Sequence, residues 1–357
     1  MYTTNKVQAA CIKVTQDALK DGRAQAVVVN SGNANACTGE KGIEDAEQTQ
    51  KVAAELLGIR SQDVVVASTG VIGVYMPMEL VEKGIALACS SLSKEGDQRA
   101  AEAIMTTDTV PKMCAVEVEI GGSTVRIGAM AKGSGMIHPN MATMLAFITT
   151  DADISVACLS KALKDSVDVS FNMISVDKDT STNDMVVILA NGLAQNKKIE
   201  SFFSEEYHQF KEALDFINKT LAQAIARDGE GATKLLEVRV MNALTEEDAR
   251  KIARSVVSSN LFKTAVFGLD ANWGRILCAA GYSGGEFDPD KVDVYLGRQM
   301  VAQDGRGIWF SEEMAREELD KEKVEVLIDL KQGTASATAW GCDLTYDYIK
   351  INASYRS

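Results

Sequence analysis

Hydrophobic and polar positions along this chain follow two periods, and they predict strands and helices mixed throughout. Short apolar runs between turn residues predict buried strands, whereas apolar residues that recur every three or four positions predict helices. The predicted strands are Ala26–Val29, Val64–Ala67, Met113–Ile120, Thr124–Met130, Met144–Thr149, Met185–Ala190, Val238–Met241, Lys263–Phe267 and Val324–Leu330, with two more in the tail Ala335–Ala353. The predicted helices are Ile43–Leu57, Glu79–Leu92, Ser155–Val167, Glu205–Ala226, Glu246–Val257 and Glu312–Leu319. This mixture indicates a layered α/β fold.

Turn and capping residues support several of these boundaries. Gly121 and Gly122 join two strand-like runs, which is typical of a hairpin. Ser155 stands directly before a helical pattern and is suited to cap its N-terminus, and Gly58 follows another helix as a C-terminal glycine does. The chain has only four prolines and no internal repeat, so no proline-rich hinge separates its elements.

Length and charge limit the kind of protein. The 357 residues are enough for one large or two modest domains, and a hydrophobic share of 46% gives ample material for a core. The formal net charge of -13 argues against a general affinity for nucleic acid or anionic membranes, which need a basic face. The opening residues lack the blocks of a signal peptide, and we expect a cytoplasmic protein.

Cysteine and histidine usage narrows the chemistry. The seven cysteines are scattered, odd in number and without a CxxC pair, which fits reduced thiols better than a disulfide framework. Only two histidines occur, His138 and His208, so a histidine-rich metal site is excluded. No GxxxxGK[ST] or GxGxxG string is present. We expect no metal and no resident cofactor.

One segment, from Ala131 to Asp151, combines a glycine-rich loop, a Pro-Asn turn and an apolar strand that starts one residue after Thr143. The small Ala142 precedes Thr143, so the threonine hydroxyl can reach the Ala142 carbonyl and perform an N→O acyl shift. Cleavage would leave Thr143 with a free amine, whose pKa near ~7.7–8.0 suits a general base. On spacing alone, however, an Ala-Thr pair at the start of a strand is usually structural.

The sequence of that segment resembles the self-cleavage segment of the ornithine acetyltransferases (glutamate N-acetyltransferases) of arginine biosynthesis. The stretches that carry the resemblance, in register from Tyr2 to Ser357, are KGSGMIHPNMATML from Lys132, NSGNANACTG from Asn30, ASTGVIG from Ala67, MTTDT from Met105, DTSTND from Asp179, DGEGATK from Asp228, KTAVFGLDANWGRI from Lys263 and IKINASYRS from Ile349.

The resemblance implies a fold and an activity. The fold would be a four-layer α/β/β/α sandwich, of the type shared by self-cleaving acetyltransferases and aminopeptidases, with a smaller C-terminal α/β lobe at roughly 240–340. Fragments 1–142 and 143–357 would form it jointly as an alpha/beta heterodimer, and further as a heterotetramer. The reaction would be ping-pong acetyl transfer from N2-acetyl-L-ornithine to L-glutamate, giving L-ornithine and N-acetyl-L-glutamate. Whether acetyl-CoA serves as a second donor stays open.

The resemblance also implies residue roles. Thr143 falls on the nucleophile, the bond between Ala142 and Thr143 on the cleavage site, and Thr69 and Gly70 on the oxyanion hole. The substrate-binding positions are Thr106, Lys132, Thr143, Glu230, Asn352 and Ser357. Lys132 would pair with the substrate α-carboxylate, and Glu230 would meet the side-chain ammonium of ornithine. Each of these residues also has an ordinary structural interpretation. Lys132 could be a solvated surface charge, Glu230 could cap a turn, and Ser357 could belong to a frayed C-terminus.

Two departures from the family pattern keep alternatives open. Relatives carry several tens of residues before the position of Tyr2, including an opening strand pair, so we expect a sheet edge without its partner. Lys178 stands where relatives usually have glycine. The alternatives are a self-cleaving, aminopeptidase-like hydrolase and an inactive, incomplete homologue. Asp179 to Asp184 also permits a carboxylate metal site, although capping of a turn explains it better, and His138 is a weaker candidate for the base than the amine of Thr143.

Overall fold

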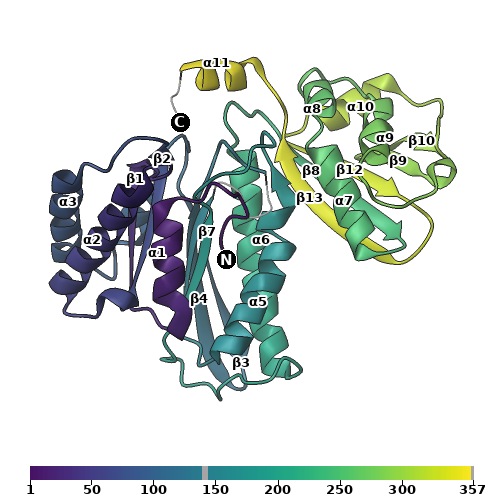
Figure 1. Ribbon diagram of the computed structural model, residues 1–357. Helices are drawn as coiled ribbons and strands as arrows, with labels where there is room; N and C mark the ends of the chain where they lie inside the picture. Colours follow the sequence, from purple (N-terminus) through teal and green to yellow (C-terminus); the bar gives the residue numbers. More distant parts are fainter. Residues whose placement is uncertain (139–143, 355–357) are drawn as a thin grey trace.

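The fold is mixed α/β throughout (Figure 1). The computed structural model describes residues 1–138 and 144–354. Its helices are α1 Ala10–Ala18, α2 Gly39–Leu57, α3 Met78–Ser90, α4 Asp97–Ala103, α5 Val156–Asp168, α6 Glu205–Arg227, α7 Glu246–Val257, α8 Asn260–Phe267, α9 Trp273–Gly281, α10 Glu312–Leu319 and α11 Tyr346–Ser354. Its strands are β1 Ala26–Asn33, β2 Val64–Val71, β3 Lys112–Ile120, β4 Ser123–Lys132, β5 Leu145–Thr150, β6 Ile174–Ser175, β7 Met185–Ala190, β8 Leu235–Ala243, β9 Asp293–Leu296, β10 Gln299–Gln303, β11 Arg306–Gly307, β12 Lys323–Asp329 and β13 Ala335–Cys342.

Four layers make up the larger part of the molecule (Figure 1). Helices α1 and α2 cover the parallel pair β1–β2, and the second sheet has the order β3-β4-β5-β7, with α5 and α6 on its far side. Strand β5 shows how the layers meet, because its side chains alternate between two cores. Leu145 and Phe147 pack toward β2, whereas Ala146 and Ile148 pack toward α5 and α6. This is the expected α/β/β/α sandwich.

The parallel pair β1–β2 is the smallest sheet. Its two strands run in register from Ala26 opposite Val64 to Gly32 opposite Gly70. Among the described residues, β1 has a strand on one side only. Its residues are half-buried or exposed, whereas the residues at the start of β2 are buried.

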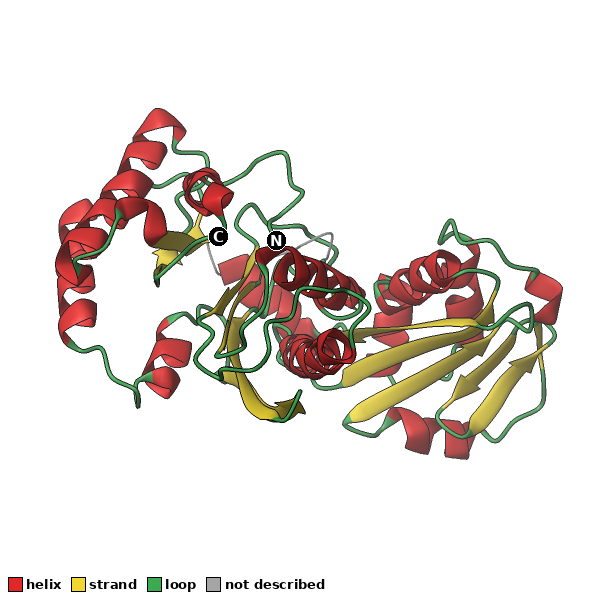
Figure 2. Ribbon diagram, turned by 90° about the horizontal axis from the view of Figure 1, so that it is seen from below, coloured by secondary structure: helices red, strands yellow, loops and turns green. Residues whose placement is uncertain are grey.

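The smaller lobe is built on a seven-stranded sheet of order β11-β10-β9-β12-β8-β13-β6 (Figure 2). Helix α7 packs against β8 and β13, and α10 packs against β9, β10 and β12. The two-residue strand β6 comes from the sandwich part of the chain and pairs with the end of β13. The lobe is therefore joined to the sandwich through β6. Throughout the part of the chain that the structure describes, every helix is too short or too polar to cross a bilayer.

Two sequence predictions of strands are wrong. Residues Lys263–Phe267 belong to α8, because Ser259 accepts a hydrogen bond from Phe262 N and caps a helix whose buried residues recur at helical spacing. The β-branched and aromatic composition favoured a strand, but tertiary packing decided otherwise. In the tail, only Ala335–Cys342 is a strand. The following residues form α11, at whose start the Thr345 hydroxyl accepts from Tyr348 N.

Candidate active site

The structure brings the predicted site residues together in one cavity. Its lining includes Thr69, Gly70, Thr106, Lys132, Glu230 and Asn352, together with Ala34, Ile72, Thr107, Gly135, Met136, Ser181, Thr182 and Asn183. The cavity has a volume of about 70 Å³, a little over twice the ~30 Å³ share of one liquid water, so it admits a group of a few heavy atoms. The predicted cleavage residues Ala142 and Thr143, and Ser357, lie outside the described residues.

Thr69 and Gly70 lie where β2 approaches β1 most closely. Gly70 has a φ of 132°, and a Cβ built on it would lie 2.2 Å from the carbonyl carbon of Gly32. Only glycine fits there, because the two strands leave no room for a side chain. Thr69 is 5% exposed, and its hydroxyl has no hydrogen bond to any described residue. The hydroxyl is therefore available to a ligand in the cavity.

A buried ionic cluster holds one wall of the cavity. Lys112 Nζ lies 2.7 Å from Asp108 Oδ1 and 2.6 Å from Asp228 Oδ2, and all three side chains are almost fully buried. Asp108 also accepts from Gly133 N at 2.7 Å. Burial acts to raise the pKa of Asp108, but the ammonium groups of Lys132 and Lys112 and the Gly133 N–H outweigh it and hold this pKa below its ordinary value.

Lys132 reaches the cavity from the end of β4. Its Nζ donates to Thr106 Oγ1 at 2.7 Å and lies 3.6 Å from Asp108 Oδ2. Burial lowers the pKa of Lys132, an effect that the Asp108 carboxylate only partly offsets. The same Asp108 carboxylate accepts from Thr106 N at 3.2 Å. One carboxylate thus orients both a hydroxyl and an ammonium toward the cavity.

Glu230 stands opposite, on the loop after α6. Its backbone N–H donates to Ser134 O at 3.0 Å, and its Oε2 accepts from Asn352 Nδ2 at 2.7 Å. A Cβ on Gly135 would lie only 2.3 Å from the Glu230 carboxylate, so any side chain there would displace this carboxylate from its present position. The bond to Asn352 brings α11, at the end of the described chain, to the cavity. A carboxylate and an ammonium therefore line the same small space.

Asp184 is the last residue of the DTSTND motif, and the structure gives it a role that the sequence does not show. It is 0% exposed, and its Oδ1 accepts from Met144 N at 3.0 Å. Its Oδ2 has no hydrogen-bond partner among the described residues. Burial raises the pKa of Asp184 well above its ordinary value and so favours its neutral, protonated form. Because Met144 directly follows Thr143, this carboxyl group fixes the chain at the predicted nucleophile.

The preceding residue, Asn183, ties three segments together. Its Nδ2 donates to Ala34 O at 2.6 Å and to Ser68 O at 2.8 Å, so it joins β1 and β2 to the start of β7. The sequence signals for Asn183 and Asp184 are the DTSTND motif and its place directly before an apolar strand. A metal site over Asp179 to Asp184 finds no support, since the described residues contain no cluster of three or more His, Cys, Asp or Glu side chains placed to hold a metal.

His138 does not line this cavity. Its Nδ1 lies 3.0 Å from Ser175 Oγ, and it faces a separate cavity with Lys178 and Arg254. Burial, together with the charges of Arg254 and Lys178, lowers the pKa of His138 to about 4. The imidazole is therefore neutral at pH 7.

The comparisons with known proteins show which class of enzyme has this sandwich and this polar cavity. The ArgJ family model matches residues 1–357. The arginine biosynthesis bifunctional proteins ArgJ of Symbiobacterium thermophilum and Caldanaerobacter subterraneus subsp. tengcongensis are 58% and 55% identical to this chain over 100% of it and 89% of their own length. A crystal structure of the Bacillus halodurans protein of that name is 46% identical, with a TM-score of 0.57, over 58% of this chain and 98% of that one. The chain belongs to the ArgJ family and is an acyltransferase of arginine biosynthesis.

We expect Asp184 to make stability depend on pH. Because its pKa is raised in the folded state, stability from this group is complete below the unfolded value near ~3.9 and falls as pH rises toward the folded value. Asp184→Asn keeps an acceptor for Met144 N but cannot ionise. The melting temperature of Asp184→Asn relative to the unchanged protein, at fixed protein concentration, should therefore rise between pH 4 and pH 7.

Asp184→Leu serves as the control. It cannot ionise either, but it leaves Met144 N without its acceptor, which costs roughly 1–3 kcal/mol at every pH. An unchanged difference between Asp184→Asn and the original chain across this pH range would show that the carboxyl group is not held neutral.

Proposed function

We propose that this enzyme transfers the acetyl group of N2-acetyl-L-ornithine to L-glutamate through an acetyl ester on Thr143, after the chain cuts itself between Ala142 and Thr143. The observation that carries the proposal is the convergence of six expected site residues on one cavity of acetyl-group size. These residues come from positions 69 to 352 of the chain, so their meeting is a property of the fold and not of local sequence.

Two observations support self-cleavage. Met144 is anchored through both its N–H and its carbonyl, to Asp184 and to Met185 N, so the chain is fixed on one side of the scissile bond. The solved Bacillus halodurans chain is matched almost completely by only 58% of this chain, so it is a much shorter polypeptide. The part of this chain from Thr143 onward is about three fifths of its length, which is the size expected of one cleavage fragment.

The cavity supplies what a tetrahedral intermediate needs. The Thr143 hydroxyl attacks the acetyl carbonyl while the Thr143 α-amine takes its proton, and the carbonyl oxygen becomes an oxyanion. In this proposal the Thr69 hydroxyl and the Gly70 N–H donate to that oxyanion, and the position of both residues in the cavity lining supports it. The C–N bond of the amide then breaks, and the α-ammonium returns the proton to the departing amine of ornithine. The glutamate amine attacks the acetyl ester by the reverse steps and restores the Thr143 hydroxyl.

Opposite charges in the cavity distinguish the two ends of the substrate. The Lys132 ammonium suits the α-carboxylate that both acetyl donor and acceptor carry, with Thr106 beside it. The Glu230 carboxylate suits the side-chain ammonium of ornithine, which glutamate lacks, and Asn352 orients this carboxylate. Ser357 is proposed as a further contact from the C-terminus.

The remaining parts of the proposal concern assembly and donor. The two fragments stay together as a heterodimer, with a heterotetramer as the larger unit, and the enzyme works in the cytoplasm without a resident cofactor. Acetyl-CoA is the second donor to be tested. An assay that follows acetate beside N-acetylglutamate separates transfer from the hydrolysis expected of an aminopeptidase-like enzyme.

Replacing the nucleophile tests self-cleavage. Thr143→Ala should remain a single chain on a denaturing gel and should form no N-acetylglutamate, because no hydroxyl is available for the acyl shift. Mass spectrometry of the original protein should find a new N-terminus at Thr143. Thr143→Ser, which keeps a hydroxyl, should still cleave, and cleavage of Thr143→Ala at the same bond would rule out the acyl shift.

The oxyanion role of Thr69 has a kinetic signature. Thr69→Ala should lower the rate of Thr143 acetylation by about 10²-fold with little change in KM, because the donated bond acts mainly in the transition state. Thr149→Ala, which removes an exposed hydroxyl from β5, is the matched control and should change neither constant. A change confined to KM would assign Thr69 to ground-state binding instead.

The two charged residues should affect the half-reactions differently. Lys132→Met should weaken both halves, because both substrates present an α-carboxylate. Glu230→Gln should slow acetyl transfer from N2-acetylornithine by roughly tenfold or more, and it should affect the glutamate half less, because only ornithine brings a side-chain ammonium. Single-turnover measurements of each half will decide, and equal losses in both for Glu230→Gln would contradict the assigned role.

A further inference from the structure

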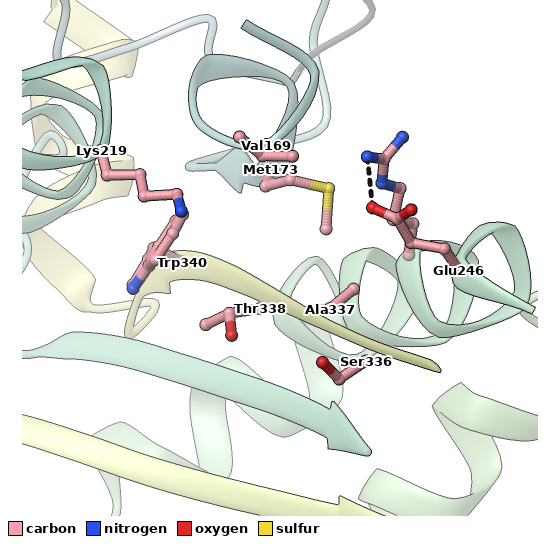
Figure 3. Close-up of a pocket in the computed structure, with 9 residues that line it drawn as sticks. Val169, Met173, Lys219, Glu246, Ser336, Ala337, Thr338 and Trp340 are labelled. Atoms are coloured by element: carbon pink, nitrogen blue, oxygen red, sulfur yellow. Dashed lines mark hydrogen bonds and ion pairs between the residues drawn. The ribbon is translucent and has the colours of Figure 1, made fainter. Parts of the chain in front are cut away.

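A second cavity lies where the large sheet meets the sandwich. Strand β6 pairs only with Trp340 and Gly341, so the residues of β13 before Trp340 have no neighbouring strand on that side among the described residues. A cavity of about 240 Å³ opens along this edge (Figure 3). Its lining is Val169, Met173, Lys219, Glu246, Arg250, Ser336, Ala337, Thr338 and Trp340. None of these residues belongs to the acyl-transfer cavity.

Charges of both signs face this space from two helices. Lys219, on α6, has no ion pair or hydrogen bond among the described residues. Glu246 and Arg250, on α7, form an ion pair of 2.7 Å. Figure 3 shows Lys219 and Glu246 on opposite sides of the cavity, with β13 between them. The arrangement suits a ligand that carries a negative and a positive group.

The rest of the lining suits a small organic molecule. The Trp340 indole is held by its Nε1, which donates to Glu237 Oε2 at 2.7 Å, and Met173 is buried beside it. The hydroxyls of Ser336 and Thr338, on β13, have no hydrogen bonds to described residues. The volume of about 240 Å³ is many times the ~10–15 Å³ that one water needs, so the cavity has room for an amino acid.

This cavity is connected to the acyl-transfer site by hydrogen bonds. Trp340 lies opposite Ile174 of β6. Val176 and Asp177, which follow β6, are hydrogen-bonded to the loop that contains Met136 and Ile137. Val176 N donates to Ile137 O at 2.7 Å, and Asp177 accepts from Met136 N and Ile137 N at 2.6 and 2.9 Å. Met136 lines the acyl-transfer cavity. An occupant that shifts β6 therefore acts on that loop through contiguous contacts.

We infer that this cavity binds a free L-α-amino acid as an effector, with its carboxylate on Lys219, its ammonium on Glu246 and its side chain against Trp340 and Met173. When the amino acid is bound, the loop with Met136 and Ile137 changes its conformation, and the rate of acyl transfer changes with it. The binding part is independent of the proposed function, whereas the effect on rate rests on it.

Calorimetric titration of the full chain with each of the twenty common L-amino acids tests the binding. The same titration of Lys132→Met, whose acyl-transfer cavity lacks its partner for an α-carboxylate, separates the two sites, because only binding at a second site persists there. At least one amino acid should bind, and Lys219→Met should weaken it about tenfold, a loss of about 1.4 kcal/mol. Lys13→Met, which removes an exposed charge from α1, is the matched control and should bind as the original chain does.

A second readout is amide hydrogen exchange at Met136 and Ile137, which should change when the bound amino acid is added and should not change in Lys219→Met. The inference is overturned if none of the amino acids binds up to millimolar concentration, or if binding is the same in Lys219→Met. If binding and exchange behave as expected but no acetyl transfer is detected, the proposed function fails while the site stands.

Discussion

The buried pairing of Asp108 with two lysines is the interaction on which the acyl-transfer cavity depends. Burying ammonium groups is costly unless a carboxylate lies beside them, and Asp108 serves Lys112 and Lys132 at once. Asp228, which is more than 100 residues further along the chain, pairs with Lys112, so two carboxylates balance the two ammonium groups. Asp108 holds Lys132 by its charge and accepts hydrogen bonds from the backbone N–H groups of Thr106 and Gly133. Through Asp228, the cluster also holds the loop that leads to Glu230. Removal of the Asp108 carboxylate would leave the ammonium groups of Lys112 and Lys132 near each other in a buried environment.

Much of the fold follows from local sequence, because most of its elements combine a clear period with a cap or turn residue. Glu246–Val257 and Glu312–Leu319 are helices with the predicted bounds. Lys263–Phe267 is different, since its β-branched and aromatic residues favour a strand in isolation and only the burial of Phe262 and Lys263 against the rest of the protein makes it helical. Helix α11 likewise depends on its capping by Thr345 and on the contact of Asn352 with Glu230.

The candidate site was predictable only where the chain carries long, distinctive motifs. Thr69, Lys132 and Glu230 stand in such motifs, and the fold then brings them to one cavity. Asp184 also stands in such a motif, DTSTND, but its burial and its contact with Met144 arise only after β5 and β7 pair, so the motif does not show what the residue does. The same holds for the effector cavity, which exists because β6 is shorter than its neighbour β13.

The position of β5 has a consequence for the lifetime of the enzyme. This strand pairs with β4 from Lys132 opposite Leu145 to Ile127 opposite Thr150, and with β7 on its other side. Under the proposed self-cleavage, the backbone cut just before β5 places a fragment boundary inside a continuous sheet and divides one folding unit between two polypeptides. Once unfolded, the two pieces would have to find each other by a concentration-dependent encounter, without the peptide link that first aligned them. The lifetime of the cleaved enzyme then depends on its rate of unfolding and not on its ability to refold.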